Sequence, residues 1–170
     1  MNENKKRIFA FKKGRVISTR HGTFVVGLSK KIVSLLNPYC ERIKVVGSIR
    51  RMEKNPIDID IVLIPKNKEK VEEVLKKKGT YVQGGEKKAI FRIEGVKVEL
   101  YYTIPGEWGA ALLAYSSRFG SSIGLRIVAR SRGFKLNQYG LFKNGIRVAG
   151  KTEEEIYNAL GRPWKSPEKR

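Results

Sequence analysis

The apolar positions of this chain form short runs with strand spacing, separated by segments with helical spacing. Strands are expected at residues 7–11, 15–18, 43–46, 58–64, 80–83, 89–93 and 96–103, and in a late hairpin around Lys143-Asn144-Gly145. Helices are expected at residues 30–36, with Ser29 as N-cap, and at 68–78, 107–117 and 121–132. A final helix is expected through Leu160, with Thr152 and Glu155 as its capping box. The chain has no internal repeat and no low-complexity linker, so its 170 residues suit one compact domain or two small ones.

Residues 47–60 carry the strongest chemical signal in this pattern. A Gly-Ser pair with two arginines follows one apolar strand, and Asp58-Ile59-Asp60 opens the next. Side chains two residues apart on a strand share a face, so Asp58 and Asp60 are expected to point the same way, about 7 Å apart. Paired carboxylates suit a hard divalent cation such as Mg²⁺. The Gly-Ser turn offers backbone N–H donors to a phosphate, and Arg51 adds a charged fork.

Glu99 is the candidate third carboxylate. It lies in the apolar strand 96–103, where an unpaired carboxylate is costly. If this strand lies beside the strand with the paired aspartates, three carboxylates meet, and a bound cation is the economical way to neutralise them. Two alternatives stay open. Glu99 could instead pair with Lys97 or Arg92 on the sheet surface, and the 47–60 stretch could be a surface hairpin with scattered charges.

The charge balance adds a partner to this picture. The chain has 36 Lys and Arg against 16 Asp and Glu, a net charge of +20. Eight of the basic residues fall between 108 and 151, where there is no acidic one, and this local excess indicates nucleic acid ahead of a membrane. The basic residues of the expected hairpin at 7–18 suit either contact with nucleic acid or protection of an exposed edge.

Several functional classes are excluded by composition. One cysteine, Cys40, excludes a disulfide framework and a Cys-based zinc cluster, and one histidine, His21, nearly excludes a Cys/His or Ser/His/Asp nucleophilic site. No apolar run approaches the length of a spanning helix, and no signal-peptide pattern opens the chain. The expected location is therefore intracellular, in the cytoplasm or wherever the genome is, with a viral source as one option.

Taken in order, these motifs resemble a minimal family X DNA polymerase of the nucleotidyltransferase superfamily. The resemblance covers about residues 28–170. It rests on Gly47-Ser48-Ile49-Arg50-Arg51, Asp58-Ile59-Asp60, Val96-Lys97-Val98-Glu99-Leu100, the block Gly133-Phe-Lys-Leu-Asn-Gln-Tyr-Gly-Leu-Phe142, and Pro163-Trp164 with Pro167-Glu168.

The resemblance implies an α+β fold in two parts. Residues 1–104 would form a nucleotidyltransferase palm with a mixed, mainly antiparallel sheet and flanking helices, together with the basic N-terminal hairpin. Residues 105–170 would form a small α/β thumb subdomain. The lyase domain and helix-hairpin-helix motifs of larger family members are not expected.

The resemblance also assigns roles residue by residue. Catalysis and metal binding, with Mg²⁺ or alternatively Mn²⁺, would fall to Asp58, Asp60 and Glu99, the last at a position where the family usually has Asp. Nucleotide binding would fall to Gly47, Ser48, Arg51, Tyr115, Ser117 and Ser122. DNA binding would fall to Lys97, Arg118, Arg126, Arg130, Lys135, Asn137 and Tyr139. The turn after Tyr115 lacks the glycine that the family has there.

The implied function is a DNA-directed DNA polymerase that adds deoxynucleotides to a primer 3′-hydroxyl by two-metal nucleotidyl transfer, in gap-filling repair. Its partners would be primer-template or gapped DNA and deoxynucleoside triphosphates, and the chain would act as a monomer. Two alternatives stay open. One is a nucleotidyltransferase that acts on a non-DNA acceptor, because the Gly-Ser and Asp-x-Asp core is shared across the superfamily. The other is a non-catalytic nucleic-acid-binding relic.

Overall fold

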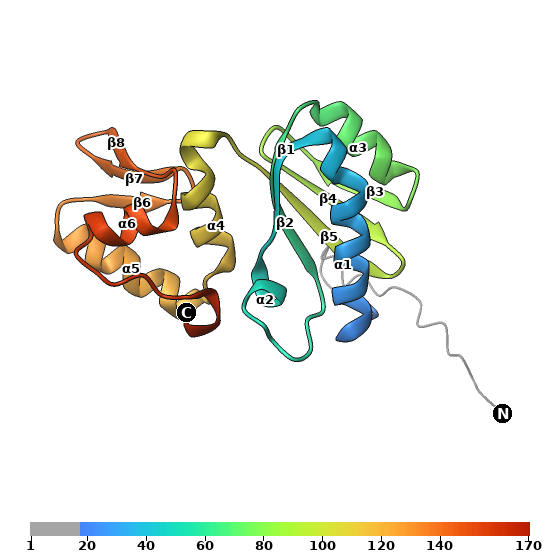
Figure 1. Cartoon of the computed structure of the whole chain (residues 1–170), viewed down its shortest axis with the longest axis horizontal. Coiled ribbons are helices and arrows are strands. Elements are labelled where there is room, and N and C mark those ends of the chain that lie inside the picture. The colour runs from blue at the N-terminus through green and yellow to red at the C-terminus, as the bar shows by residue number, and fades with distance from the viewer. Residues whose placement is uncertain (1–17) are drawn as a thin grey trace.

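The chain folds around two sheets, each with its own helices (Figure 1). The computed structural model describes residues 18–170, so the expected hairpin strands at 7–11 and 15–18 lie outside the described residues, apart from Ser18. The strands are β1 (Cys40–Val45), β2 (Ile59–Pro65), β3 (Thr80–Gly84), β4 (Lys88–Ile93), β5 (Val96–Tyr102), β6 (Lys135–Asn137), β7 (Gly140–Lys143) and β8 (Ile146–Ala149). The helices are α1 (Thr23–Leu36), α2 (Gly47–Arg50), α3 (Lys68–Lys76), α4 (Trp108–Ser116), α5 (Phe119–Ser131) and α6 (Glu153–Ala159), with 3₁₀ turns at Asn37–Tyr39, Pro105–Glu107 and Pro167–Lys169. Among these described helices, none is long and apolar enough to cross a bilayer.

The five-stranded sheet has the order β1-β2-β5-β4-β3 and contains one parallel pair. β2 and β5 run parallel, whereas the pairs β1–β2, β5–β4 and β4–β3 are antiparallel. The expectation of a mixed, mainly antiparallel sheet is therefore confirmed. The parallel pair needs a long crossover connection, and α3 with the β3–β4 hairpin supplies it.

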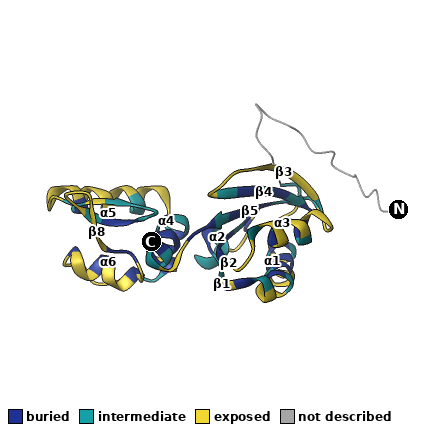
Figure 2. Cartoon of the chain, turned by 90° about the horizontal axis from the view of Figure 1, so that it is seen from above, coloured by how far each residue is buried: buried dark blue, intermediate teal, exposed yellow. Residues whose placement is uncertain are grey.

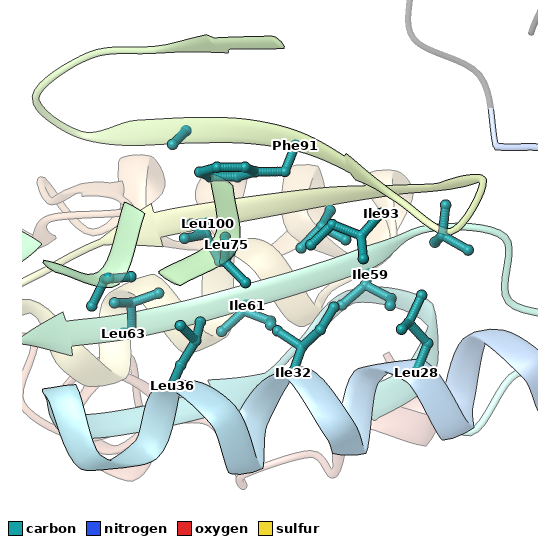
Figure 3. Packing of buried hydrophobic residues seen from close by; sticks show 14 of the residues in the cluster. Leu28, Ile32, Leu36, Ile59, Ile61, Leu63, Leu75, Phe91, Ile93 and Leu100 are labelled. Atoms are coloured by element: carbon teal, nitrogen blue, oxygen red, sulfur yellow. The ribbon is translucent and has the colours of Figure 1, made fainter. Parts of the chain in front are cut away.

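Alternation along β2 and β5 divides the sheet into two faces. Ile59, Ile61 and Leu63 of β2 are fully buried, and they pack against α1 and α3 in the main hydrophobic core (Figure 3). Because successive side chains of a strand alternate, the residues between them point to the opposite face. On that opposite face Val62 packs against Ala111 and Leu112 of α4. The polar residues of β2 and β5 therefore face α4 and the elements that follow it.

The second core lies between α4, α5, α6 and the three-stranded sheet. Its fully buried members include Leu141 of β7 and Ile156 of α6. Helix α4 connects this second core to the five-stranded sheet, because Ala110 and Leu113 pack in the second core while Ala111 and Leu112 pack with Val46 and Val62 in a small third cluster on the sheet face opposite the main core. Figure 2 shows α4 as a mostly buried segment between the two sheets.

The structure corrects two local predictions. Helix α1 begins at Thr23 and not after Ser29, because the apolar side chains that precede Ser29 already belong to the same helix. Ser29 is buried inside α1, where its hydroxyl donates to the Val26 carbonyl at 2.7 Å. The Gly-Ser turn is a single helical turn, α2. The hairpin at Asn144-Gly145 is confirmed, and so is the role of Thr152 as N-cap of the last helix, because its hydroxyl accepts from the Glu155 N–H at 3.1 Å.

Candidate active site

Two carboxylates lie side by side on the sheet face that points toward α4. In the parallel register of β2 and β5, Asp60 is directly opposite Glu99. Asp58 lies just before β2, where the hydroxyl of Ser18 donates to its Oδ1. The condition on which Glu99 becomes a neighbour of the paired aspartates is therefore met, because β5 lies directly beside β2.

Two lysines neutralise part of this carboxylate cluster. The ammonium of Lys97 lies 2.9 Å from Glu99 Oε2 and 3.2 Å from Asp58 Oδ2. Lys88, on β4, forms an ion pair with Glu99 Oε1. The sequence offered two environments for Glu99, an ion pair with Lys97 or a place beside the two aspartates, and the structure shows both at once. As the side chains stand, no three Asp, Glu, His or Cys residues within residues 18–170 are grouped closely enough to hold one metal ion.

The carboxylates differ in how well they are compensated. Burial raises the pKa of Asp60 to about 6, and the negative charges of Glu99 and Asp58 add to the increase. Burial would also raise the pKa of Glu99, but hydrogen bonds from Lys88 and Lys97 outweigh it and hold that pKa below its usual value. Asp60 is therefore the carboxylate whose negative charge the protein leaves least balanced.

Gly47 brings the backbone against the Asp60 carboxylate. Its φ is +64°, and a Cβ at this position would stand 2.3 Å from Asp60 Oδ2, so a side chain is excluded by both conformation and space. The oxygen donors of Asp58, Asp60 and Glu99 are the ligand type that hard divalent cations prefer. The lysines at the cluster are single charges on flexible stems, which can turn away without disturbing the core. The donor set is therefore of the chemical type that suits a divalent metal ion, although the three side chains would have to draw closer together to share one.

The two arginines of α2 and its C-cap have different partners. Arg50 forms a two-pronged ion pair with Glu153 of α6, with Nη1–Oε1 and Nη2–Oε2 distances of 2.8 and 2.9 Å. Arg51 donates from Nε and Nη2 to Glu53 Oε1 at 3.0 and 2.8 Å, and from Nη1 to the Ser116 carbonyl at 3.2 Å. The two side chains are about equally covered, 14% exposed for Arg50 and 15% for Arg51, so they differ in their partners: Arg50 is committed to α6, whereas Arg51 pairs with Glu53 of its own turn and with the end of α4. Ser48, also predicted to bind phosphate, is half-buried in α2.

An aromatic pair links α4 to the carboxylates. The rings of Tyr115 and Tyr101 stack with centroids 3.8 Å apart and planes 16° apart. The hydroxyl of Tyr101 donates to Asp60 Oδ1 at 3.4 Å. The sequence reasoning missed Tyr101 and Lys88. Tyr101 could have been found from strand alternation, because it is two residues from Glu99 and shares its face of β5. Lys88 could have been found from the register of the β4–β5 hairpin, in which it is opposite Tyr101.

Four of the other predicted residues line one hollow between α4, α5 and β6: Ser117, Ser122, Arg126 and Asn137. Ser117 is partly committed elsewhere, because its hydroxyl donates to the Leu113 carbonyl at 2.7 Å. This hollow brings two residues predicted for the nucleotide together with two predicted for DNA.

The remaining basic and polar residues are spread over the C-terminal elements. Arg130 and Lys135 line an open groove with Phe134 and Phe142. Tyr139 lies under the ammonium of Lys87, a residue of the turn between β3 and β4, 5.6 Å from the ring centroid. Arg118 is exposed, and its Nε lies 3.8 Å from Glu53 Oε1.

Comparison with known proteins adds independent findings. A family model described as "DNA polymerase beta thumb" matches residues 122–170. Two proteins named Repair DNA polymerase X, from the Tick/Malawi isolate and the Badajoz strain of African swine fever virus, are each 31% identical over 179 residues, a match that covers 97% of this chain and 95% of each relative. DNA polymerase IV of Saccharomyces cerevisiae is 36% identical over 64 residues, which is 38% of this chain and 11% of that protein.

Proposed function

This chain belongs to family X of the DNA polymerases, which are nucleotidyltransferases, and we propose that it fills gaps in DNA during repair. It would extend a primer 3′-hydroxyl with deoxynucleoside triphosphates. The observation that carries this proposal is the meeting of Asp60, Glu99 and Gly47: two carboxylates in register on parallel strands, with a glycine backbone packed against one of them.

The proposal divides the chain in two. Residues up to 104 form a nucleotidyltransferase palm, and residues 105–170 form the thumb, of which 122–170 match the family model. The separate hydrophobic cores of the two sheets support this division, and α4, which packs in the second core and on the open face of the five-stranded sheet, connects the two parts. The net charge of +20 supports a polyanionic substrate that lies along both parts.

Asp58, Asp60 and Glu99 would hold divalent ions, with Mg²⁺ as the proposed species and Mn²⁺ as an alternative. When bound, two such ions stabilise the attacking and leaving oxygens and lower the pKa of the attacking hydroxyl. Gly47, Ser48 and Arg51 would hold the outer phosphates of the nucleotide. Tyr115 and the hollow with Ser117 and Ser122 would contact its base and sugar.

The DNA would be held by basic and polar side chains on both parts. Lys97 is 21% exposed and lies among the carboxylates, a position that suits contact with the primer end. The thumb would supply Arg118, Arg126, Arg130, Lys135, Asn137 and Tyr139. The run of eight basic residues without an acidic one between 108 and 151 supports this role.

Primer extension with a labelled oligonucleotide tests the proposal. Gapped, templated and single-stranded DNA are compared with each nucleotide supplied separately, with Mg²⁺, with Mn²⁺ and with a chelator. We expect metal-dependent addition, greatest on gapped DNA, that follows the template. Transfer to a non-DNA acceptor only, or DNA binding without any incorporation, would contradict the proposal and favour one of the two alternatives given above.

A further inference from the structure

The C-terminal end of α2 is locked into one conformation. The Glu53 N–H donates to the Ser48 carbonyl and the Met52 N–H donates to the Ile49 carbonyl, both at 3.0 Å. This is the two-bond arrangement of a Schellman cap, with Met52 in the left-handed region at φ 58°. The cap normally has glycine at that position, so the chain accepts backbone strain to hold this turn.

The cap places Glu53 against the predicted phosphate-binding arginine. Arg51 donates from Nε and Nη2 to one oxygen of Glu53, so the side-on fork of the guanidinium is occupied. This fork is the edge that binds a carboxylate or a phosphate through two parallel hydrogen bonds. An anion that arrives at Arg51 from that side meets a carboxylate already in place.

The same carboxylate attracts a cation from the thumb. Arg118, immediately before α5, has its Nε 3.8 Å from Glu53 Oε1. Glu53 thus stands between an arginine of the Gly-Ser turn and an arginine of the C-terminal part. These are the positive charges that a nucleotide's phosphates would meet at the proposed phosphate site beside α2.

We propose that Glu53 is an internal substitute for phosphate, which occupies Arg51 and draws in Arg118 until the triphosphate of a nucleotide displaces it. Glu53 would therefore be a residue that sets nucleotide affinity by competition, and it would touch neither the primer nor the transferred phosphoryl group. The inference rests on the proposed function, because it assumes that Arg51 binds the outer phosphates.

The proposal predicts that removal of the negative charge of Glu53 strengthens triphosphate binding. Glu53→Gln keeps the side-chain shape but removes a negative charge a few ångströms from the site of the phosphates. Glu53 is 36% exposed, so solvent weakens the interaction and the expected gain in triphosphate affinity is about 3- to 10-fold. Competition also predicts that the nucleotide KM falls while kcat changes little.

The expected gain in affinity is tested by calorimetric titration of the full chain and of Glu53→Gln with inorganic triphosphate. A second titration uses a non-hydrolysable deoxynucleotide analogue in the presence of Mg²⁺. The matched control is Glu41→Gln, an exposed glutamate on β1 that gives the same change in net charge. A double-mutant comparison adds specificity: in an Arg51→Ala background, Glu53→Gln should gain no more affinity than Glu41→Gln does.

The possible outcomes are distinct. Tighter binding by Glu53→Gln than by Glu41→Gln, lost in the Arg51→Ala background, supports the proposal. Equal binding by the two variants, or weaker binding by Glu53→Gln, overturns it while leaving the phosphate site intact. Failure of the unmodified chain to bind either ligand overturns it together with the assignment of Arg51.

Discussion

Two charged clusters meet α2, one at each end, and they differ in the cations that close them. Gly47 at the start of α2 packs against Asp60, which neighbours Glu99, Lys97 and Lys88. At the other end, Arg50 and Arg170 enclose Glu153. Both clusters contain buried carboxylates, yet only one of them has the properties of a binding site.

In the arginine cluster both oxygens of the Glu153 carboxylate are paired, although Nη2 of Arg170 is buried without a hydrogen-bond partner among the described residues. The side chain of Glu153 is 5% exposed while that of Arg170 is fully buried. Burial alone would raise the pKa of Glu153, but hydrogen bonds from Arg50 and Arg170 keep it below the ordinary value. Guanidinium groups match a carboxylate in shape and stay charged, so this cluster joins α2 to α6 and has no oxygen left for a ligand.

The aspartate cluster is incomplete by the same criteria. Its cations are lysines, which bind as point charges on mobile stems, and they favour Glu99 and Asp58 over Asp60. Asp60 consequently keeps a raised pKa of about 6. The comparison teaches that the geometry of the partner cation, more than the number of charges, separates a fully paired carboxylate from one whose charge is left poorly balanced.

The largest expected effect is on catalysis. Asp60→Asn keeps the size of the side chain but removes the charge that is least balanced by the protein. Primer extension should fall by about 10³-fold or more. The DNA affinity of the variant, measured by fluorescence anisotropy at fixed salt, should stay within about twofold of that of the unmodified chain. Unchanged primer extension would contradict the assignment of Asp60 as a metal ligand.

The second effect is on stability and comes from the other cluster. Glu153→Gln leaves two buried guanidinium groups without their counter-charge, so the free energy of unfolding should fall by about 3–5 kcal/mol. Urea denaturation followed by circular dichroism measures it. Glu154→Gln, on an exposed neighbour in the same helical turn, is the control and should cost less than about 1 kcal/mol. Equal losses in both variants would contradict the distinction drawn between the clusters.

The third expected effect is a gain in stability, opposite in sign to the loss expected of Glu153→Gln. Because the folded pKa of Asp60, about 6, lies above its ordinary 3.8, the folded chain binds more protons between those values, and the free energy of unfolding should fall as pH rises from about 4 to 6. Asp60→Asn should remove this slope and stabilise the protein at pH 7 by up to about 3 kcal/mol. Denaturation across this pH range, in a chelator, tests it, and a destabilised variant would contradict the idea that Asp60 is held at a cost.

The smallest effect concerns the turn that connects the clusters. Met52 adopts φ 58° and is 73% exposed, so Met52→Gly should relieve backbone strain without removing packing. The relief is partly offset by the greater freedom of glycine in the unfolded chain, which leaves a gain of about 0.5–1 kcal/mol. Thermal unfolding checks it. A loss of stability would show that the left-handed turn is not strained.

Much of the fold was predictable from local pattern. Strand alternation identified β4 and β5 and the turn between them, and turn and capping residues located the β7–β8 hairpin and α6. The start of α1 was missed because apolar spacing continues before Ser29, and a serine inside a helix has the same sequence signal as an N-cap. The sequence did not predict that β2 and β5 are neighbours, and the meeting of Asp60 with Glu99 could be stated only on that condition. The reason is that strand order depends on contacts between residues far apart in the chain.

By itself the sequence determined where the candidate residues lie, since the Gly-Ser turn, the Asp-x-Asp strand and the local excess of basic residues are properties of neighbouring positions. Only the tertiary structure decided how their charges are shared. In the folded chain Arg50 pairs with Glu153 and Arg51 pairs with Glu53. Lys88 and Lys97 pair with Glu99, and the negative charge of Asp60 is the least compensated. The physical reason is that electrostatic pairing depends on distance and burial, which are set by the packing of segments distant in sequence.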